Sequence, residues 1–190
     1  MMQKTMTSVT IVYHSGYGHT AAQAAAVLEG VQSVPGVSAQ LIRVEDVENH
    51  WETLDRSDAI VFGSPTYMGS VSGPFKTFMD ATSRRWLQQA WKDKIAAGFT
   101  NSGSLSGDKL NTLVQLAIFA AQHGMLWVGQ AELPAGRADD AINRIGSMLG
   151  AAAQSDHGST GPSEGDLATA RRFGARVAQA AQRWQRGATT

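Results

Sequence analysis

The chain of 190 residues contains no cysteine. Disulfides, thiolate nucleophiles and cysteine-ligated zinc or iron–sulfur centres are therefore excluded. The chain also lacks an excess of charge of either sign, because 16 Lys and Arg balance 16 Asp and Glu. Binding of nucleic acid needs a basic field, so this balance argues against nucleic acid as a partner. It argues more weakly against a strongly acidic electron carrier that is steered to basic partners.

Long apolar runs and metal-binding motifs are missing as well. No run approaches the roughly 18 apolar residues of a membrane-spanning helix. Residues 1–8 are polar and lack the apolar core of a signal peptide. We therefore expect a cytoplasmic protein without a membrane span. The five histidines show no H-E-x-x-H motif and no other paired spacing, so we expect no metal site.

What the chain does have is a regular alternation of strand and helix patterns. Short apolar or β-branched segments predict strands at residues 8–13, 37–44, 57–63, 94–100 and 125–128. Helical patterns cover 21–30, 45–56, a segment that begins at Pro74, 108–123 and 167–184. This order predicts one α/β domain over residues 1–190. We expect a three-layer, doubly wound parallel five-stranded sheet with the flavodoxin-like order 2-1-3-4-5.

Some helix ends and faces can be predicted in more detail. Asp108 is expected to cap the helix at 108–123, and the apolar spacing predicts burial of Leu110, Leu113, Val114, Ala117 and Ile118. Residues 129–165 show little periodicity and are expected to be irregular. Ser163 and Asp166 resemble a capping box for the last helix, a helix expected over 163–184 and followed by a short tail at 187–190.

Three loops are expected to form one rim, because ligands of open α/β sheets bind outside the carboxyl ends of the strands. The first loop, residues 15–20, has the sequence SGYGHT. Its glycines and the hydroxyls of Ser15 and Thr20 can offer donors to an anion at a helix N-terminus. The loop lacks both the P-loop lysine and G-x-G-x-x-G, which favours a monophosphate over a triphosphate or a dinucleotide.

The other two loops suit a planar ligand. In residues 63–73, Thr66 offers a hydrogen-bond donor, and Tyr67 and Met68 offer surface for an apolar ring system. In residues 101–107, small side chains expose backbone donors and acceptors. Trp86 and Trp91 follow the third helix pattern and are candidates for exposed aromatic residues, whereas Trp127 lies in a predicted strand.

Five segments together carry a resemblance to a known family. Residues 15–20, 63–69, 73–80, 122–125 and 161–175 resemble the flavodoxin-like FMN proteins, and among them the tryptophan-repressor-binding-protein-like NAD(P)H:quinone oxidoreductases. The resemblance implies FMN as the cofactor, with NADH or NADPH as co-substrate and a quinone-like small molecule as acceptor. A hydride would pass to the flavin and then to the quinone, so the flavin is the reagent and no side chain is expected to be catalytic. A homodimer or homotetramer is also implied.

The resemblance carries over to individual residues. Those implied to bind the cofactor are Ser15, Gly16, Tyr17, Gly18, His19, Thr20, Pro65, Thr66, Tyr67, Met68, Asn101, Ser102, Gly103, Ser104, Leu105, Ser106 and Gln122. Tyr17 and Trp86 match residues at the substrate site. This sequence has Tyr67-Met68 where the family has Arg-Phe. Gln122, followed by His123, stands where the family places a histidine near the flavin.

Two alternatives remain open from the sequence. A flavodoxin-type electron-transfer protein of the same fold would have no NAD(P)H site of its own. A flavin-free binding or regulatory module would take up no FMN, and the fold alone does not distinguish it from the other two. The sequence leaves open the physiological acceptor and the choice between NADH and NADPH.

Overall fold

The structure, a computed structural model, describes residues 6–188. Residues 1–5 and 189–190 lie outside this description, and with them the beginning of the polar N-terminal segment and the end of the predicted tail.

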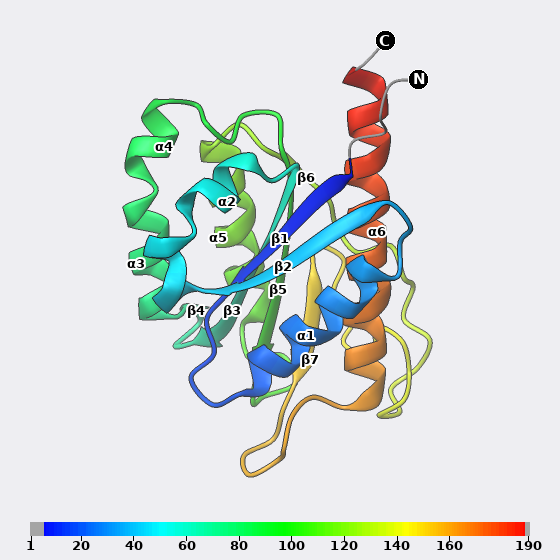
Figure 1. The fold of residues 1–190 in the computed structure, drawn as a ribbon. Coiled ribbons are helices and arrows are strands. Elements are labelled where there is room, and N and C mark those ends of the chain that lie inside the picture. Colours follow the sequence, from blue (N-terminus) through cyan, green and yellow to red (C-terminus); the bar gives the residue numbers. More distant parts are fainter. Residues whose placement is uncertain (1–5, 189–190) are drawn as a thin grey trace.

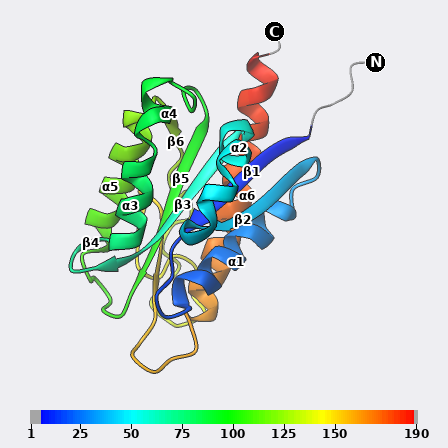
Figure 2. The ribbon, with the colours of Figure 1, turned by 60° about the vertical axis from the view of Figure 1, so that its left-hand side comes forward.

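A parallel sheet forms the centre of the fold, as Figures 1 and 2 show. Its strands lie in the order β2-β1-β3-β5-β6, which confirms the predicted flavodoxin-like topology. Their bounds are β1 Thr7–Tyr13, β2 Val37–Arg43, β3 Ala59–Tyr67, β5 Ile95–Ser102, β6 Leu126–Trp127 and β7 Ala151–Gln154. A short strand, β4 (Ser70–Val71), folds back antiparallel to the end of β3.

Helices cover both faces of this sheet (Figure 2). On one face lie α1 (His19–Gln32) and α6 (Glu164–Ala188), packed on Ile11 and Val61. On the other lie α3 (Gly73–Ala81) and α5 (Lys109–Gln122), packed on Val12 and Phe62. The connecting helices α4 (Ser83–Leu87), α2 (Trp51–Arg56) and the 3₁₀-helix η1 (Val44–Asn49) complete this second layer. Neighbouring residues of a strand thus pack into the cores on opposite faces of the sheet, which explains the continuous apolar runs.

The α1–α6 pair is close because glycine lies at the crossing. A Cβ atom added to Gly30 of α1 would come 1.8 Å from the carbonyl oxygen of Arg171. A Cβ atom on Gly174 of α6 would come 2.1 Å from the carbonyl oxygen of Val27. Both helices therefore expose backbone to each other, and larger side chains here would push them apart.

The fifth strand position differs from the prediction. It is filled by two pieces: β6 pairs with Ile95 and Ala96 at the beginning of β5, and β7 pairs with residues 99–102 at its end. The expected irregular segment 129–165 therefore contains a strand, Ala151–Gln154. Three alanines and a glutamine have low intrinsic strand preference, and pairing with the edge of β5 overrides it.

The segment between these two pieces is attached to α6 by polar contacts. Arg144 forms a bidentate pair with Asp166 at 3.0 Å, and the Asn143 amide donates to Thr169 Oγ1 at 2.8 Å. Asp166 also accepts the Gln154 amide at 2.8 Å. Ser163 Oγ accepts the Asp166 amide, as the capping-box pattern predicts, but the Asp166 carboxylate pairs with Arg144 and does not complete the box.

Two predictions about α5 are wrong. Leu110, Val114 and Ile118 are exposed, and the buried face carries Leu113, Leu116, Phe119 and Ala120. Asp108 occupies the N-cap position, but in a left-handed conformation with φ 53° and without a side-chain capping hydrogen bond. The helix has apolar residues on both faces, so spacing alone does not decide which one meets the sheet. Trp91 is also buried, against Phe62 and Phe119.

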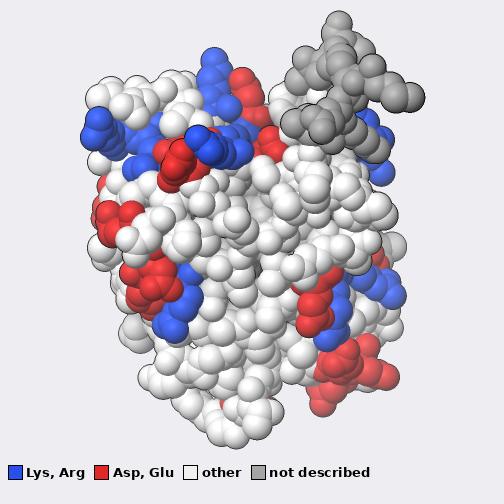
Figure 3. Space-filling view, in the orientation of Figure 1, with Lys and Arg blue, Asp and Glu red and all other residues white. Residues whose placement is uncertain are grey.

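Charges of opposite sign are mixed over the surface. On the face drawn in Figure 3, basic and acidic side chains lie next to one another and leave large areas with neither. Ion pairs such as Arg85–Asp55 and Arg171–Glu29 join elements far apart in the sequence. Within residues 6–188, no helix is both long and apolar enough to span a membrane.

His123 gives the fold a pH-dependent stability. Its ring is 2% exposed, lies against Trp91 and Phe119, and donates from Nε2 to Thr82 Oγ1 at 2.9 Å. Burial lowers the pKa of His123 from 6.5 to about 4. Between pH 6.5 and 4, His123 is therefore protonated in the unfolded chain and neutral in the folded chain. The free energy of unfolding falls as the pH falls through this range.

We expect this histidine alone to account for up to about 3 kcal/mol of acid destabilisation. Denaturant unfolding of wild type and His123→Phe between pH 7 and 4 tests this. The variant should have the flatter profile, and His50→Gln serves as the control that retains the wild-type slope. Parallel profiles for wild type and His123→Phe would contradict the assignment.

Candidate functional site

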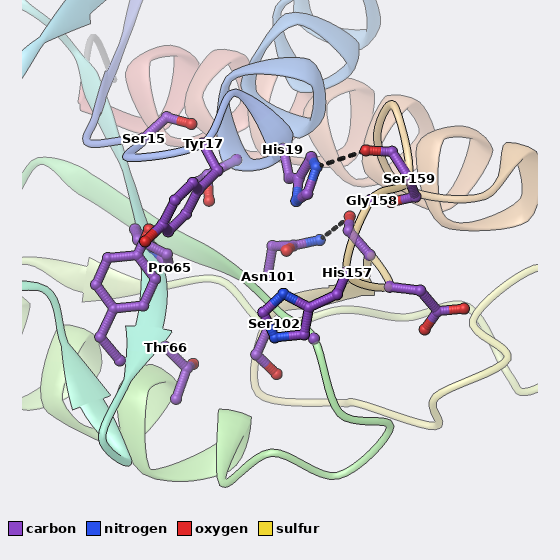
Figure 4. Close-up of a pocket in the computed structure, with 15 residues that line it drawn as sticks. Ser15, Tyr17, His19, Pro65, Thr66, Asn101, Ser102, His157, Gly158 and Ser159 are labelled. Carbon is purple, nitrogen blue, oxygen red and sulfur yellow. Dashed lines mark hydrogen bonds between the residues drawn. The ribbon is translucent and has the colours of Figure 1, made fainter.

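A pocket of about 600 Å³ lies at the carboxyl ends of β1, β3 and β5 (Figure 4). This volume is within the range of small-molecule sites. The lining residues come from the three predicted loops and from a fourth loop, after β7. They are Ser15, Tyr17, His19, Thr20, Pro65, Thr66, Tyr67, Asn101, Ser102, Gly103, Ser155, Asp156, His157, Gly158 and Ser159.

The N-terminus of α1 opens into one end of this pocket. Gly18 precedes the helix with φ 88°, a left-handed conformation that glycine adopts without strain. Ser15 Oγ accepts the amides of Gly18 and Ala21, both at 3.1 Å, so its own proton remains free to donate. The amides of His19 and Thr20 have no intrahelical partner at this position. This end of the pocket therefore offers donors to an anion without a lysine or arginine.

The wall formed by β3 and β5 is more rigid than the sequence indicates. Pro65 and Asn101 were expected in loops, but they pair across the sheet as part of the β3–β5 ladder. Thr66 Oγ1 donates to Thr112 Oγ1 at 2.8 Å and lies 2.8 Å from Thr100 Oγ1. The hydroxyl proton of Thr66 is thus used inside the protein. The expectation that this side chain donates to a ligand is wrong, although the residue lines the pocket.

Two tyrosines stand at the mouth of the pocket. Tyr17 is 82% exposed and meets Tyr67 edge-on, with ring centroids 6.3 Å apart. Tyr67 leans over the first loop, since a Cβ atom on Gly16 would lie 2.6 Å from its hydroxyl oxygen. Burial raises the pKa of the Tyr67 phenol above its ordinary value, so the ring stays neutral. The mouth therefore presents uncharged aromatic surface.

Behind Tyr67, a buried contact joins β1 to the beginning of α3. His14 Nδ1 lies 2.8 Å from Ser72 Oγ, and its Nε2 lies 3.7 Å from a Glu45 carboxylate oxygen. Burial lowers the pKa of His14, with Glu45 acting in the opposite direction. Ser72 is fully buried, so this arrangement supports the loop rather than facing a ligand.

The loop after β7 was missed by sequence reasoning. Asn101 Nδ2 donates to Ser155 Oγ at 2.9 Å, and His19 Nε2 lies 3.0 Å from the Ser159 carbonyl oxygen. His157, labelled in Figure 4, belongs to the same loop and also lines the pocket. The sequence signal for this loop was the Ser- and Gly-rich composition of residues 155–161. Because the strand before it was not predicted, this composition could not be assigned to the edge of the sheet where ligands bind.

Gln122 and Trp86 do not reach this pocket. Both line a separate groove of about 510 Å³ between α3, α4 and α5, with walls from Met79 and Ile118. His123 lies at its base and is buried. The prediction that Gln122 contacts the cofactor is not supported within one chain, because α5 carries it away from the sheet edge. The same separation applies to Trp86 as a substrate wall.

The remaining predicted residues belong to the pocket's loops without lining it. They are Gly16, Gly18, Met68, Ser104, Leu105 and Ser106. Met68 is fully exposed with φ 48°, and Leu105 is exposed at the turn after β5. Among residues 6–188, no group of three or more His, Asp or Glu side chains is arranged to hold a metal ion.

Comparison with known proteins identifies the family. The model of the NADPH-dependent FMN reductase family matches residues 14–140. The chain belongs to this family. It is 43% identical to a protein named Flavodoxin FldP from Pseudomonas aeruginosa, over 93% of this chain and 98% of the relative. It is 34% identical to an NAD(P)H dehydrogenase (quinone) from Solidesulfovibrio magneticus, over 93% of this chain and 98% of the relative.

A solved structure agrees with this assignment. The flavodoxin, WrbA-like protein from Agrobacterium tumefaciens is 44% identical, with a TM-score of 0.76 over 93% of this chain and 98% of that chain. A flavodoxin from the domain Archaea, 24% identical with a TM-score of 0.67 over 92% of this chain and 98% of that chain, shares the fold. The predictions of a flavodoxin-like FMN family close to WrbA, and of FMN as cofactor with NAD(P)H as co-substrate, are confirmed.

The pocket fits this cofactor on its own evidence. Free first-turn amides at one end suit a phosphate, and the flat wall at the other end suits a planar ring. No lining residue within the described chain is a lysine or an arginine, which agrees with the absence of a triphosphate motif.

We expect Thr20→Val to weaken FMN binding by about 1–3 kcal/mol, because a phosphate oxygen would lose its hydroxyl donor while the buried shape is kept. Fluorescence titration of the apoprotein measures the affinity. Thr77→Val is the control, because Thr77 is exposed on α3 and its hydroxyl bonds only to the Gly73 carbonyl. Equal affinities of Thr20→Val and wild type would mean that the phosphate lies elsewhere.

Proposed function

We propose that this FMN oxidoreductase transfers a hydride from NAD(P)H, by way of its flavin, to a quinone. The observation that carries the proposal is the neutral aromatic surface that Tyr17 and Tyr67 form at the mouth of the pocket. Tyr17 is exposed and meets Tyr67 edge-on, and both residues line the pocket. A neutral planar acceptor can stack on this surface.

We propose that the two ends of the pocket hold different parts of FMN. Ser15, Gly16, Gly18 and Thr20 would hold the phosphate through hydroxyl and backbone donors. Pro65, Tyr67 and residues 101–106 would border the isoalloxazine. The strand pairing of Pro65 with Asn101 supports this division, because it fixes both sides of the ring slot on one rigid ladder.

The chain's own part in the reaction is binding, orientation and exclusion of water. FMN supplies the two-electron hydride chemistry when it is bound. The titratable lining side chains of the described pocket are Tyr17, His19, Tyr67, Asp156 and His157, and none is needed as a nucleophile. Tyr17 stands where it can cover an incoming nicotinamide or quinone, which agrees with its expected place at the substrate site.

An anaerobic absorbance experiment tests the proposal. FMN-loaded protein should lose its visible flavin absorbance on addition of NADH or NADPH and regain it on addition of a benzoquinone. Reduction by only one nucleotide would define the preference that the sequence leaves open. Absorbance that persists with both nucleotides would overturn the proposal.

A second candidate is a flavodoxin-type electron carrier, favoured by the relative named Flavodoxin FldP at 43% identity. Such a carrier would be reduced by a protein partner and not by free nucleotide. Its docking usually relies on charge of one sign, and the mixed charges on the face drawn in Figure 3 offer little of this. The absorbance experiment separates the two candidates, because dithionite would still bleach a carrier that NAD(P)H leaves unchanged.

We also propose that Trp86 acts at the substrate site of a second copy of the chain, in a homodimer or homotetramer. Its groove continues along α5 into an exposed apolar stripe formed by Leu110, Val114 and Ile118. These residues are spaced by four and share one helix face. Contact between copies along this face would cover the stripe. It would also bring Trp86 of one copy close to the pocket of the other.

Trp86→Ala should then raise the KM for quinone about 2–10-fold through loss of aromatic contact, with little change in FMN affinity. Trp184→Ala is the matched control, since Trp184 is similarly exposed near the end of α6. Light scattering gives the oligomeric state in the same samples. An enzyme that is active as a monomer, or equal KM values for quinone in Trp86→Ala and Trp184→Ala, would show that Trp86 is not part of the substrate site.

A further inference from the structure

Lys109, the first residue of α5, is a buried lysine behind the loop that follows β5. Its side chain is 3% exposed, and its ammonium donates to the carbonyl oxygens of Ser104 and, at 3.2 Å, Leu105. Ser104 and Leu105 are themselves exposed at the pocket's rim. A charged group is thus held inside the protein by the backbone of a surface loop that carries predicted cofactor contacts.

The loop is fixed from two directions. Gly107 and Asp108 are both left-handed, with φ 53°, and turn the chain back so that the two carbonyls converge on Lys109. On the other side, Gln154 Nε2 donates to the Gly103 carbonyl at 3.2 Å, and the Ser155 amide donates to the Ser102 carbonyl at 3.2 Å. Lys109 therefore holds the loop after β5 from the protein interior, and β7 with its following residue holds it from the side of the neighbouring strand.

The direction of these carbonyls determines the direction of the neighbouring amides. In a trans peptide the N–H points opposite to the C=O, and the described chain has no cis peptide. With the carbonyls of Ser104 and Leu105 turned inward to the ammonium, the amides of Leu105 and Ser106 face outward. They are then available to the acceptor atoms along the edge of a planar ligand.

This lysine is unfavourable for stability near neutral pH. Burial lowers the pKa of Lys109 from 10.5 to about 8. Asp166 on α6 acts in the opposite direction, and Arg144, before β7, lowers this pKa further. A folded pKa below the unfolded one means that folding is opposed while the group is charged. That opposition fades as the pH rises from 8 to 10.5. The charge on Lys109 therefore does not itself add to the stability of the fold.

We propose that Lys109 is a positioning residue for FMN, whose ammonium turns the carbonyls of Ser104 and Leu105 inward and so presents the backbone donors of residues 103–106 to the flavin. The inference rests on the proposed placement of the isoalloxazine beside residues 101–106. It does not depend on the identity of the electron donor or acceptor.

The test compares Lys109→Met with Lys94→Met. Lys94 is a matched control because its ammonium also bridges two carbonyls, those of Asp55 and Ser57 at 2.8 and 2.6 Å, at the opposite end of β5. Backbone amide NMR shifts of the apoprotein and FMN affinity are measured at pH 7. Lys109→Met should move the amide signals of residues 103–106, because their peptide planes are no longer held, and should weaken FMN binding about 10-fold, without lowering the unfolding temperature. Lys94→Met should leave FMN affinity unchanged.

A pH series adds a readout that a purely structural role would not change. Asp166, Arg144 and the neighbouring Asp108 are the charged groups around Lys109. With its pKa lowered to about 8, Lys109 loses its charge between pH 7 and 9.5. FMN affinity of wild type should fall over this range, because charge-assisted hydrogen bonds weaken when the ammonium is lost. The affinity of Lys109→Met should stay level.

Each outcome decides the proposal. Unchanged amide shifts in Lys109→Met, or pH profiles that coincide, would overturn it. Moved amide signals with unchanged FMN affinity would overturn it as well, and would show that the flavin does not meet residues 103–106. No measurement uses turnover, so a failure of NAD(P)H to reduce the protein would count against the proposed function alone.

Discussion

The site depends on the parallel pairing of β1, β3 and β5. Because the three strands run in one direction, their carboxyl ends meet at the same edge of the sheet. Tyr13 lies beside Gly63, and Pro65 beside Asn101, so the loops that follow diverge from adjacent points. A pocket lined by residues from positions 15 to 159 of the chain follows from this register. Reversal of any one strand would move its loop to the other end of the molecule.

The second constraint is the absence of strong cations where an anion is expected. The described lining has no lysine or arginine, and the donors come from backbone amides and from Ser15 and Thr20. Such donors are fixed by the fold and carry no large hydration shell, so they need little rearrangement to meet a phosphate. Near the rim, the Lys109 ammonium is directed inward to loop carbonyls. Its charge therefore contacts the backbone of the loop and not the pocket.

Local chemistry decides the elements that the sequence predicts correctly. Buried β-branched runs, the glycine-rich turn after β1 and Pro74 at the beginning of α3 all predict their elements. Expectations are wrong where a residue's partner lies far away in the chain. Thr66 was expected to donate to a ligand, but its proton goes to Thr112, 46 positions later. Residues 151–154 have the composition of a helix and become a strand because the edge of β5 is open beside them. Gln122 is the first residue of a segment, 122–125, that resembles the family, yet it lies at the end of α5 in a different groove.

By itself, the sequence determined the order of strands and helices, the two-sided burial of the sheet and the glycine-rich turn after β1, because each depends on residue type within a few positions. Only the tertiary structure decided which face of α5 is buried, that the loop after β7 closes the pocket, and that Lys109 is buried beneath the rim. These features depend on which surfaces are left to pack once the sheet has formed. That is a property of distant residues meeting in space, and no local pattern encodes it.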